Sequence, residues 1–492
     1  MQRAADQQFW GHPRALSTLF FAELWERFSY YGMRALLVLF LVQAVTGGGF
    51  GLDDRTAAAI YGLYTAGVYI ASVPGGWIAD RLIGAQRAVL WGGIIIALGH
   101  LLLALAGTLT AFCTGLAVIV VGTGLLKPNI AALVGTLYPE GGARRDAGFT
   151  VFYMGINLGA MIGPLATGAL AQRYGWGVGF GAAALGMVLG VAWFVITRAR
   201  LAGAGAQPSP HPQGEAGWRR DLQRVLWVSA LLLALALLFA SGVTGLSVQQ
   251  LRGATVWLIL AFMVAGFGQM LLGSGLSRDE RGRVIWLLVL CAASSVFWSG
   301  FEQAGSSLTL FAERFTQREF AGWVLPTSWF QSLNSIFIII FAPLFSALWL
   351  SLGKRNRDLS SGGKFVLALL AMAGSFVVMA GASRIVAGGA MAGAGWLVAT
   401  YLLHTWGELA LSPVGMSAAT QLVPARYSGQ AMGLWYGSLS LGNLVASLFA
   451  GEFDTSNLAA MPGQYLHISF IQAVAAAVLV LLLWLWRRGA KA

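Results

Sequence analysis

Apolar runs of about 20 residues recur along the whole chain and are separated by short polar stretches. Such runs are typical of membrane-spanning helices, since about 20 helical residues cross the hydrocarbon core of a bilayer. The pattern predicts 14 spans, which begin near residues 16, 56, 86, 110, 147, 176, 223, 254, 283, 328, 364, 394, 428 and 466. We therefore expect an all-α integral membrane protein.

The predicted spans divide into six, two and six. The two central spans carry no charged residue inside their apolar runs, whereas the outer spans carry all of the intramembrane charges. We predict an N-terminal six-helix bundle at 1–197, a linker with an inserted helix hairpin at 198–281, and a C-terminal six-helix bundle at 282–492. Two pseudo-symmetric six-helix halves are typical of transporters that bind their substrate at the midplane between the halves.

Composition supports this class of protein. The chain is 57% hydrophobic and 10% charged, whereas a soluble domain has about 25% charged residues. A soluble domain of appreciable size is therefore excluded. The 65 glycines fit membrane helices, which use small residues to pack closely. The N-terminus lacks a short apolar core followed by small residues, so we expect no secretory signal peptide.

No residue pattern indicates a cofactor. Cys113 and Cys291 lie in separate apolar runs, and we expect buried fillers rather than a disulfide. The five histidines show no metal-ligand spacing. The Gly-Lys pairs at 353–354 and 363–364 lack the spaced glycine and the following Ser or Thr of a phosphate-binding loop. We expect no metal and no cofactor.

Basic residues mark one side of the membrane. The formal net charge is +12, and 22 of the 31 Lys and Arg residues lie on one side if the N-terminus is cytoplasmic. Six lie on the opposite side and three lie inside apolar spans. Because short loops rich in Lys and Arg stay in the cytoplasm, we predict a multi-pass inner-membrane protein with both termini cytoplasmic. The charge then belongs to the inner membrane face and does not indicate nucleic-acid binding.

Seven ionisable residues fall inside the predicted spans. They are Glu23, Glu26, Arg27, Arg34, Lys127, Glu302 and Glu408. At roughly 2.5–3.5 kcal/mol each, they would cost on the order of 20 kcal/mol if they faced lipid. That exceeds the stability of a typical domain, about 5–15 kcal/mol. These residues must therefore pair with one another or line a water-filled cavity.

Five of the polar residues share one helix face, because their spacing is i, i+3, i+4, i+7 and i+11. They are Glu23, Glu26, Arg27, Tyr30 and Arg34, with Leu24, Trp25 and Phe28 on the other side. We expect this polar stripe to point inward. A static ion pair that clamps two helices remains an alternative for Glu23 and Arg27. Packing alone does not require so many polar side chains.

The remaining intramembrane charges lie near helix disruptions. Lys127 precedes Pro128, where we expect a kink. Glu408 lies five residues before Pro413, for which a kink that serves packing alone is the alternative. Glu302 is followed by the polar residues Gln303, Ser306 and Ser307. Disrupted helices at membrane depth are tolerated where they line water.

The stripe segment "ELWERFSYYG", residues 23–32, resembles the first-helix signature of the proton-dependent oligopeptide transporter (POT) family, a branch of the major facilitator superfamily. "PGGWIADRLIGAQR" at 74–87 and "FTVFYMGINLGAMIGP" at 149–164 also resemble family signatures. Further matches are "GTGLLKPN", "FEQAGSSL", "FQSLNS", "GELALSPVG" and "MGLWYG". The resemblance covers both halves, and bacterial members also carry an extra helix pair. It implies two major-facilitator-type six-helix bundles plus an inserted two-helix hairpin.

The resemblance also implies roles for residues. Proton coupling would involve Glu23, Glu26, Arg27, Lys127 and Glu302. Substrate binding would involve Arg27, Tyr30, Tyr31, Arg34, Tyr69, Lys127, Asn157, Trp298, Glu302, Asn334, Glu408, Ser412 and Trp435. In that set the basic side chains would bind the peptide carboxylate. Glu408 and the two asparagines would bind the amino end, and the aromatic rings would contact the variable side chains. Tyr61 and Tyr64 fit the wall less clearly.

Two positions depart from the family pattern. Asn334 is followed by Ser335 where the family usually has proline, so the resemblance does not imply the family's bend at this position. The place that matches a proton-handling histidine of animal members is Gly62. Carboxylates are therefore the candidates for proton coupling in this chain.

We thus expect a proton-coupled symporter that imports di- and tripeptides by alternating access. Its expected partners are peptide, protons and the lipid bilayer, without nucleic acid, and we expect a monomer. One alternative is a transporter of the same fold for nitrate, another organic anion or a peptide-like drug. A membrane enzyme or receptor is a more distant alternative, since the sequence shows no metal cluster, no GxSxG-type nucleophile and no folded domain outside the membrane.

Overall fold

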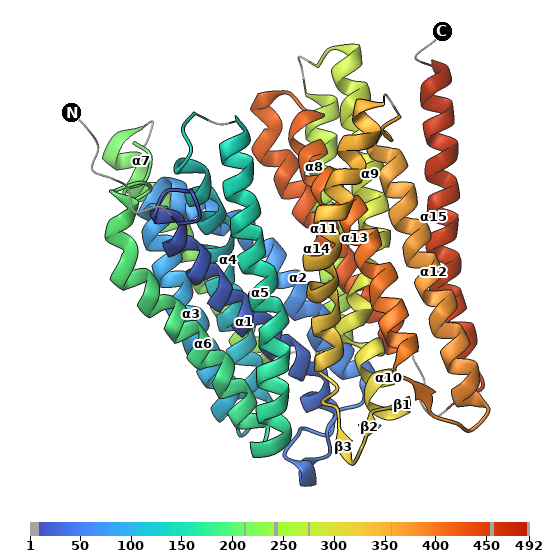
Figure 1. Ribbon diagram of the computed structural model, residues 1–492. Coiled ribbons are helices and arrows are strands. Elements are labelled where there is room, and N and C mark those ends of the chain that lie inside the picture. Colours follow the sequence, from blue (N-terminus) through green and yellow to red (C-terminus); the bar gives the residue numbers. More distant parts are fainter. Residues whose placement is uncertain are drawn as a thin grey trace. The chain divides into compact units, whose positions relative to one another are not determined.

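The computed structural model describes residues 9–140, 142–210, 213–240, 245–273, 276–355, 357–452 and 457–489 (Figure 1). Across these residues, 14 helices of 21 residues or more correspond to the 14 predicted spans. The prediction of an all-α chain is thus confirmed, apart from four two-residue strands.

The long helices follow one another along the chain. They are α1 (Ala15–Val42), α2 (Asp54–Ile78), α3 (Ala85–Leu105), α4 (Leu109–Thr136), α5 (Gly142–Tyr174), α6 (Trp176–Thr197), α7 (Gly214–Ala240), α8 (Val248–Leu272), α9 (Arg278–Phe301), α11 (Trp329–Lys354), α12 (Ser361–Ala387), α13 (Gly395–Gln421), α14 (Ser428–Gly451) and α15 (Met461–Gly489). The short elements are η1 (Val45–Gly47), η2 (Ala79–Ile83), η3 (Arg198–Leu201), η4 (Glu302–Gly305), α10 (Ser307–Phe315) and η5 (Ala425–Tyr427). Strand β1 (Thr316–Gln317) pairs in parallel with β4 (Ala392–Gly393), and β2 (Glu319–Phe320) pairs antiparallel with β3 (Trp323–Val324).

Ten of the described helices have the length and apolar composition of a membrane span. Helix α1 is not one of them, and it is the helix that carries the charged stripe. Its 28 residues nevertheless extend about 42 Å, which exceeds the hydrocarbon thickness of about 30 Å. We therefore treat α1 as a span whose charges must be compensated by the protein.

The chain forms two compact units. One consists of Met1–Leu36 and Gly67–Leu251, and the other of Leu37–Ala66 and Arg252–Ala492. Helices α1 and α2 therefore each contribute residues to both units. The two helices of the inserted segment also separate, α7 with the first unit and α8 from Arg252 onward with the second. The division at 197 and 281 remains a prediction.

Glycines allow close helix packing in the first unit. Gly155, Gly159 and Gly163 recur every four residues on α5 and lie against the backbone of α1. A Cβ atom built at Gly159 would lie 2.9 Å from Cβ of Arg27. This row of small residues on α5 continues at Thr167, whose Oγ1 donates to the carbonyl oxygen of Gly32 at 3.0 Å. Small residues thus bring α5 directly against the charged helix.

The opposite side of α1 meets α6. The ring of Phe28 lies over Gly186, and Trp25 lies beside Gly190. Phe28 is buried and Trp25 is half-buried. The apolar side of α1 therefore contacts a neighbouring helix.

The segment predicted as a linker is docked on the connection between α2 and α3. Nε2 of Gln86 donates to the carbonyl oxygen of Ala204 at 2.7 Å. The main-chain amide of Ser209 donates to the main-chain carbonyl oxygen of Asp80 at 2.9 Å. Farther along, Nε1 of Trp218 donates to the carbonyl oxygen of Leu82 at 3.3 Å. The linker is therefore anchored to the first unit over most of its described length.

In the second unit, the first part of α2 packs on α14. A Cβ atom at Gly62 would collide with the side chain of Ser447, and Oγ of Ser440 donates to the carbonyl oxygen of Ala66 at 3.1 Å. At the start of α2, Asp54 accepts two hydrogen bonds from Arg314 of α10, at 2.6 and 2.8 Å. This part of α2 is therefore fixed at both ends.

The row of glycines on α5 predicts a specific loss of stability on substitution. Gly159→Ala should destabilise the protein by about 1–3 kcal/mol, because the added methyl group overlaps the backbone of Leu24. Gly181→Ala on α6 is the matched control, since a Cβ atom there meets no atom of the described residues within 4 Å. Alanine is also the better helix former by about 1 kcal/mol. Melting temperatures of the purified proteins in detergent would measure both effects, and equal values would contradict the packing.

Candidate functional site

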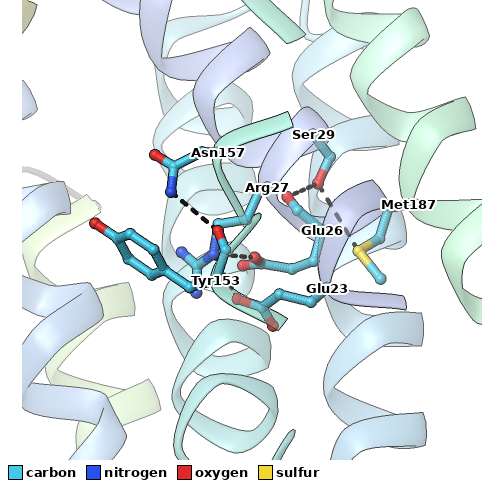
Figure 2. Close-up of polar contacts among 7 residues, drawn as sticks. All are labelled: Glu23, Glu26, Arg27, Ser29, Tyr153, Asn157 and Met187. Atoms are coloured by element: carbon cyan, nitrogen blue, oxygen red, sulfur yellow. Dashed lines mark hydrogen bonds and ion pairs between the residues drawn. The ribbon is translucent and has the colours of Figure 1, made fainter. Parts of the chain in front are cut away.

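A buried charge cluster lies in the middle of α1 (Figure 2). Nε of Arg27 donates to Oε1 of Glu23 at 2.7 Å and lies 3.1 Å from Oε2 of Glu26. The exposed fractions of Glu23, Glu26 and Arg27 are 1%, 0% and 6%. The predicted pairing within this helix is confirmed. It follows from the spacing, since residues four apart are neighbours on a helix.

The cluster has more negative charge than positive charge. Two carboxylates share one guanidinium, and Oε2 of Glu23 and both oxygens of Glu26 have no hydrogen-bond partner among the described residues. Lys127 on α4 is near enough to interact electrostatically with Glu26. Buried charges of this kind are costly unless they are paired or neutralised. The arrangement is therefore suited to gaining or losing a proton or an ionic partner.

Neighbouring helices enclose this cluster. Gly159 on α5 leaves the space that Arg27 occupies. On the far side of α1, Oγ of Ser29 donates to the carbonyl oxygen of Glu26 at 2.8 Å and lies 3.8 Å from Sδ of Met187 (Figure 2). The carboxylates of Glu23 and Glu26 both point toward the Arg27 side chain in this view.

The rest of the polar stripe is also inside the protein. Tyr30 and Arg34 are each 6% exposed. The Arg34 guanidinium lies 5.7 Å from the ring centroid of Tyr31, and the rings of Tyr30 and Tyr31 meet edge to face at 5.1 Å. The prediction that the stripe points inward is confirmed.

Two further candidates in the first unit lie on α4 and α5. Nζ of Lys127 lies 4.1 Å from the ring centroid of Tyr69, a cation–π contact. Asn157 is buried, and its Nδ2 donates to the carbonyl oxygen of Tyr153 at 2.9 Å (Figure 2). Helix α4 continues through Pro128, so the proline beside Lys127 does not end the helix.

In the second unit, Glu302 lies at a helix break. It is 3% exposed and is the first residue of η4, between α9 and α10. The predicted disruption is confirmed here. Oη of Tyr61 donates to Oε2 of Glu302 at 2.9 Å. The neighbouring polar residues stabilise the turn itself, since Gln303 donates to the carbonyl oxygen of Ala446 at 2.9 Å and accepts from Ser307 at 2.6 Å.

The acid predicted to bind the amino end of a peptide is also in this unit. Nδ2 of Asn334 on α11 donates to Oε2 of Glu408 on α13 at 2.9 Å, and to Oγ1 of Thr405 at 3.1 Å. Helix α13 continues through Pro413, and α11 continues through Ser335. The Asn334 amide and the Glu408 carboxylate, which are both predicted to bind the amino end of a peptide, are thus in contact.

The other candidates of the second unit are Trp298, Ser412 and Trp435. Trp298 is 6% exposed, and its Nε1 has no hydrogen-bond partner among the described residues. Trp435 is 2% exposed, and its ring lies over Gly415. Ser412 is half-buried, one turn after Glu408. Their contact with a substrate stays a prediction.

Sequence reasoning missed some partners of these residues. The sequence places Tyr61 only near the expected aromatic wall, whereas the structure makes it a hydrogen-bond donor to Glu302. Thr405 was not singled out. The sequence signals only that a buried carboxylate at Glu302 requires a donor, and not which residue supplies it.

The described residues contain no group of three or more His, Cys, Asp or Glu side chains that could hold a metal ion. Cys113 and Cys291 are free thiols.

Comparison with known proteins places this geometry in context. A family model described as the POT family matches residues 86–465. The chain is 41% identical over 489 residues to the peptide transporter YePEPT of Yersinia enterocolitica, which covers 96% of this chain and 94% of that protein. It is 34% identical over 443 residues to a di-/tripeptide transporter of Lactococcus lactis, with 88% of each chain covered.

A solved structure is also similar. A mutant of peptide transporter POT in complex with alafosfalin matches with a TM-score of 0.88 and 40% identity, over 96% of this chain and 95% of that one. These matches confirm the resemblance seen in the sequence and the predicted major-facilitator-type fold.

The charge cluster predicts a stability pattern. Arg27→Met should destabilise the protein by about 3–5 kcal/mol, because it leaves buried carboxylates without their cation. Adding Glu23→Gln and Glu26→Gln to that variant should restore part of the loss, since no uncompensated charge then remains on this turn. Thermal unfolding in detergent would compare the two proteins. A triple variant that is no more stable than Arg27→Met would contradict the charge argument.

Proposed function

The chain belongs to the POT family, and on this premise we propose that it is a proton-coupled symporter that imports di- and tripeptides by alternating access. The observation that carries the proposal is the sharing of Arg27 by two buried glutamates on α1. As a member of a transporter family, the chain moves a solute across the membrane. We infer that it catalyses no chemical conversion.

The charge cluster supports a proton step. With both glutamates ionised, Glu23, Glu26 and Arg27 together carry one negative charge. A proton that binds Glu26 from outside neutralises this charge and weakens its attraction for Arg27, which can then attract a peptide carboxylate. Release of the proton to the cytoplasm restores the ion pair and expels the carboxylate. Glu23, Lys127 and Glu302 take part in the same exchange in this proposal.

A proton gradient supplies enough energy for accumulation. One proton that moves inward gains about 2.3 kcal/mol per 100 mV, and each favourable pH unit adds about 1.4 kcal/mol. Together these terms sustain a peptide gradient of about 500-fold at one proton per peptide. The proposal therefore needs no nucleotide.

Two poles support a zwitterionic substrate. Arg27, Arg34 and Lys127 belong to the first unit and would attract the carboxylate, while Glu408 with Asn334 belongs to the second and would attract the amino group. The termini of an extended dipeptide are about 7 Å apart at most. Because every short peptide has these termini, such a site would tolerate different side chains. The relatives named above as peptide and di-/tripeptide transporters support this substrate class.

The remaining candidates would shape the site around those poles. Asn157 would assist at the amino end, and Ser412 would add a hydroxyl one turn beyond Glu408. Aromatic walls would come from Tyr30, Tyr31, Tyr69, Trp298 and Trp435, whose rings combine an apolar face with a polar tip.

The chain is a multi-span membrane protein of a bacterial transporter family, and we propose the inner membrane as its location. We propose that both termini are cytoplasmic, because 22 basic residues then lie inside and six outside. We also propose that it functions as a monomer with the bundles at 1–197 and 282–492.

The proton step predicts a selective defect for Glu26→Gln. Proteoliposomes with an imposed pH gradient and membrane potential should accumulate labelled dipeptide with the wild type and not with this variant. Counterflow of peptide without a proton gradient should persist, because exchange needs no net proton movement. Glu215→Gln is the matched control, since the side chain of Glu215 is 76% exposed. Undiminished accumulation by Glu26→Gln would refute the proposed role.

The zwitterion proposal predicts the order of competitors. In the same proteoliposomes, excess dialanine should suppress uptake of labelled dipeptide at least tenfold more strongly than nitrate or free alanine does. The physical reason is that dialanine has both charged termini at the spacing of a dipeptide, whereas nitrate has no amino group and the termini of free alanine are closer together. Stronger inhibition by nitrate would instead favour an anion transporter of the same fold.

A further inference from the structure

The hydrogen bond between Tyr61 and Glu302 joins two buried side chains far apart in the sequence. Tyr61 on α2 has an exposed fraction of 0%, and its hydroxyl donates to Oε2 of Glu302 at 2.9 Å. Hydrogen bonds to an ionised acceptor are roughly twice as strong as those between neutral groups. This contact is therefore strongest when Glu302 carries its charge.

The turn that holds Glu302 is shaped to receive this tyrosine. Gly305, the last residue of η4, lies under the Tyr61 ring, and a Cβ atom built there would lie 2.6 Å from Cε2 of the ring. Only a residue without a side chain fits at this distance. The close approach of α2 to the turn is thus a second observation, independent of the hydrogen bond.

Tyr61 lies on a helix that contributes to both units. Residues up to Ala66 of α2 belong to the second unit, and α2 continues into the first unit from Gly67. Next to Tyr61, Gly62 packs on Ser447 of α14. A change in how Tyr61 holds Glu302 therefore acts on a helix that runs from one unit into the other.

We propose that Tyr61 is a positioning residue for Glu302. Its hydroxyl holds the charged carboxylate against α2, and the hold weakens when Glu302 is neutralised. Docking of the first part of α2 on the η4 turn is thereby tied to the charge of this carboxylate. This inference rests on the proposed function, in which Glu302 takes part in proton coupling.

Titratable groups of α10, α13 and the start of α2 also have contacts of their own. Tyr401 of α13 donates to the main-chain oxygen of Ala304 at 3.3 Å. His404, also on α13, is buried with its ring 5.8 Å from that of Phe301. The ion pair of Asp54 with Arg314 lies at the start of α2 and the end of α10. Tyr61 reaches the carboxylate itself, whereas Tyr401 reaches the backbone of the same turn.

Tyr61→Phe and Tyr401→Phe therefore form a matched pair. Each removes one hydroxyl that is hydrogen-bonded to the same turn, and each keeps the ring. In proteoliposomes, Tyr61→Phe should lower proton-driven accumulation of labelled dipeptide about tenfold, while counterflow stays within about twofold of wild type. Tyr401→Phe should leave both activities within about twofold. A purely structural role of Tyr61 would lower the two activities together.

A double variant tests the route through Glu302. If Tyr61 acts by positioning that carboxylate, adding Tyr61→Phe to Glu302→Gln should lower accumulation no further than Glu302→Gln alone. Gly305→Ala should reproduce the selective defect by displacing the ring, and it provides a second test if Tyr61→Phe does not fold.

Three outcomes would overturn the inference. The first is equal transport activity of Tyr61→Phe and Tyr401→Phe. The second is a loss of counterflow together with accumulation in Tyr61→Phe. The third is a double variant whose accumulation is lower than that of Glu302→Gln alone. All three require a wild type that accumulates peptide. A wild type that shows no proton-driven uptake would instead refute the proposed function.

Discussion

Arg27 is a buried cation whose charge must be compensated inside the protein, and its partners Glu23 and Glu26 lie on the same helix. This local compensation lets α1 cross the membrane with charges that lipid would not tolerate. It is also incomplete, because two acids share one base. A fully balanced cluster would be a static clamp. In the proposed function, the excess carboxylate is the group that a proton or an incoming cation would neutralise.

The close packing around α1 follows from the same constraint. A charged helix that crosses a bilayer needs neighbours that exclude lipid from its polar side. On α6, Gly186 and Gly190 make room for the side chains of Phe28 and Trp25, while on α5 Gly159 and the glycines one turn away on either side lie against the α1 backbone. These glycines remove side chains where backbones approach, so that the long charged side chains of α1 have room. The high glycine content and the few buried charges are thus two parts of one arrangement.

Much of this arrangement could be predicted from the sequence because it is local or periodic. Apolar runs of about 20 residues predict the helices, and the four-residue separation of Glu23 and Arg27 predicts their ion pair. The helix break at Glu302 is also signalled by its polar neighbours. In each case the information lies within one or two helix turns.

Contacts between distant segments could not be predicted in this way. Tyr61 and Glu302 are 241 residues apart, and nothing in the local pattern of either residue names the other. Likewise, the Gly-, Pro- and Ala-rich composition of 198–224 predicts a linker, but its docking depends on backbone groups such as the carbonyl oxygen of Ala204. Backbone acceptors carry no sequence signature, so only the folded chain reveals which side chains they receive.

Distant contacts also hold the first part of α2 in the second unit. The first part of α2 is tied to it by Arg314 at Asp54, by Glu302 at Tyr61 and by Ser440 at Ala66. Two of these three contacts involve a carboxylate, so their strength depends on charge, whereas the third depends on packing and a neutral hydrogen bond. Helix α8 meets the same region, because Arg252 donates to the carbonyl oxygen of Ser447, the residue that packs on Gly62. The inserted helix therefore supports the α14 surface on which α2 docks, and the two carboxylate contacts are the charge-dependent part of this docking.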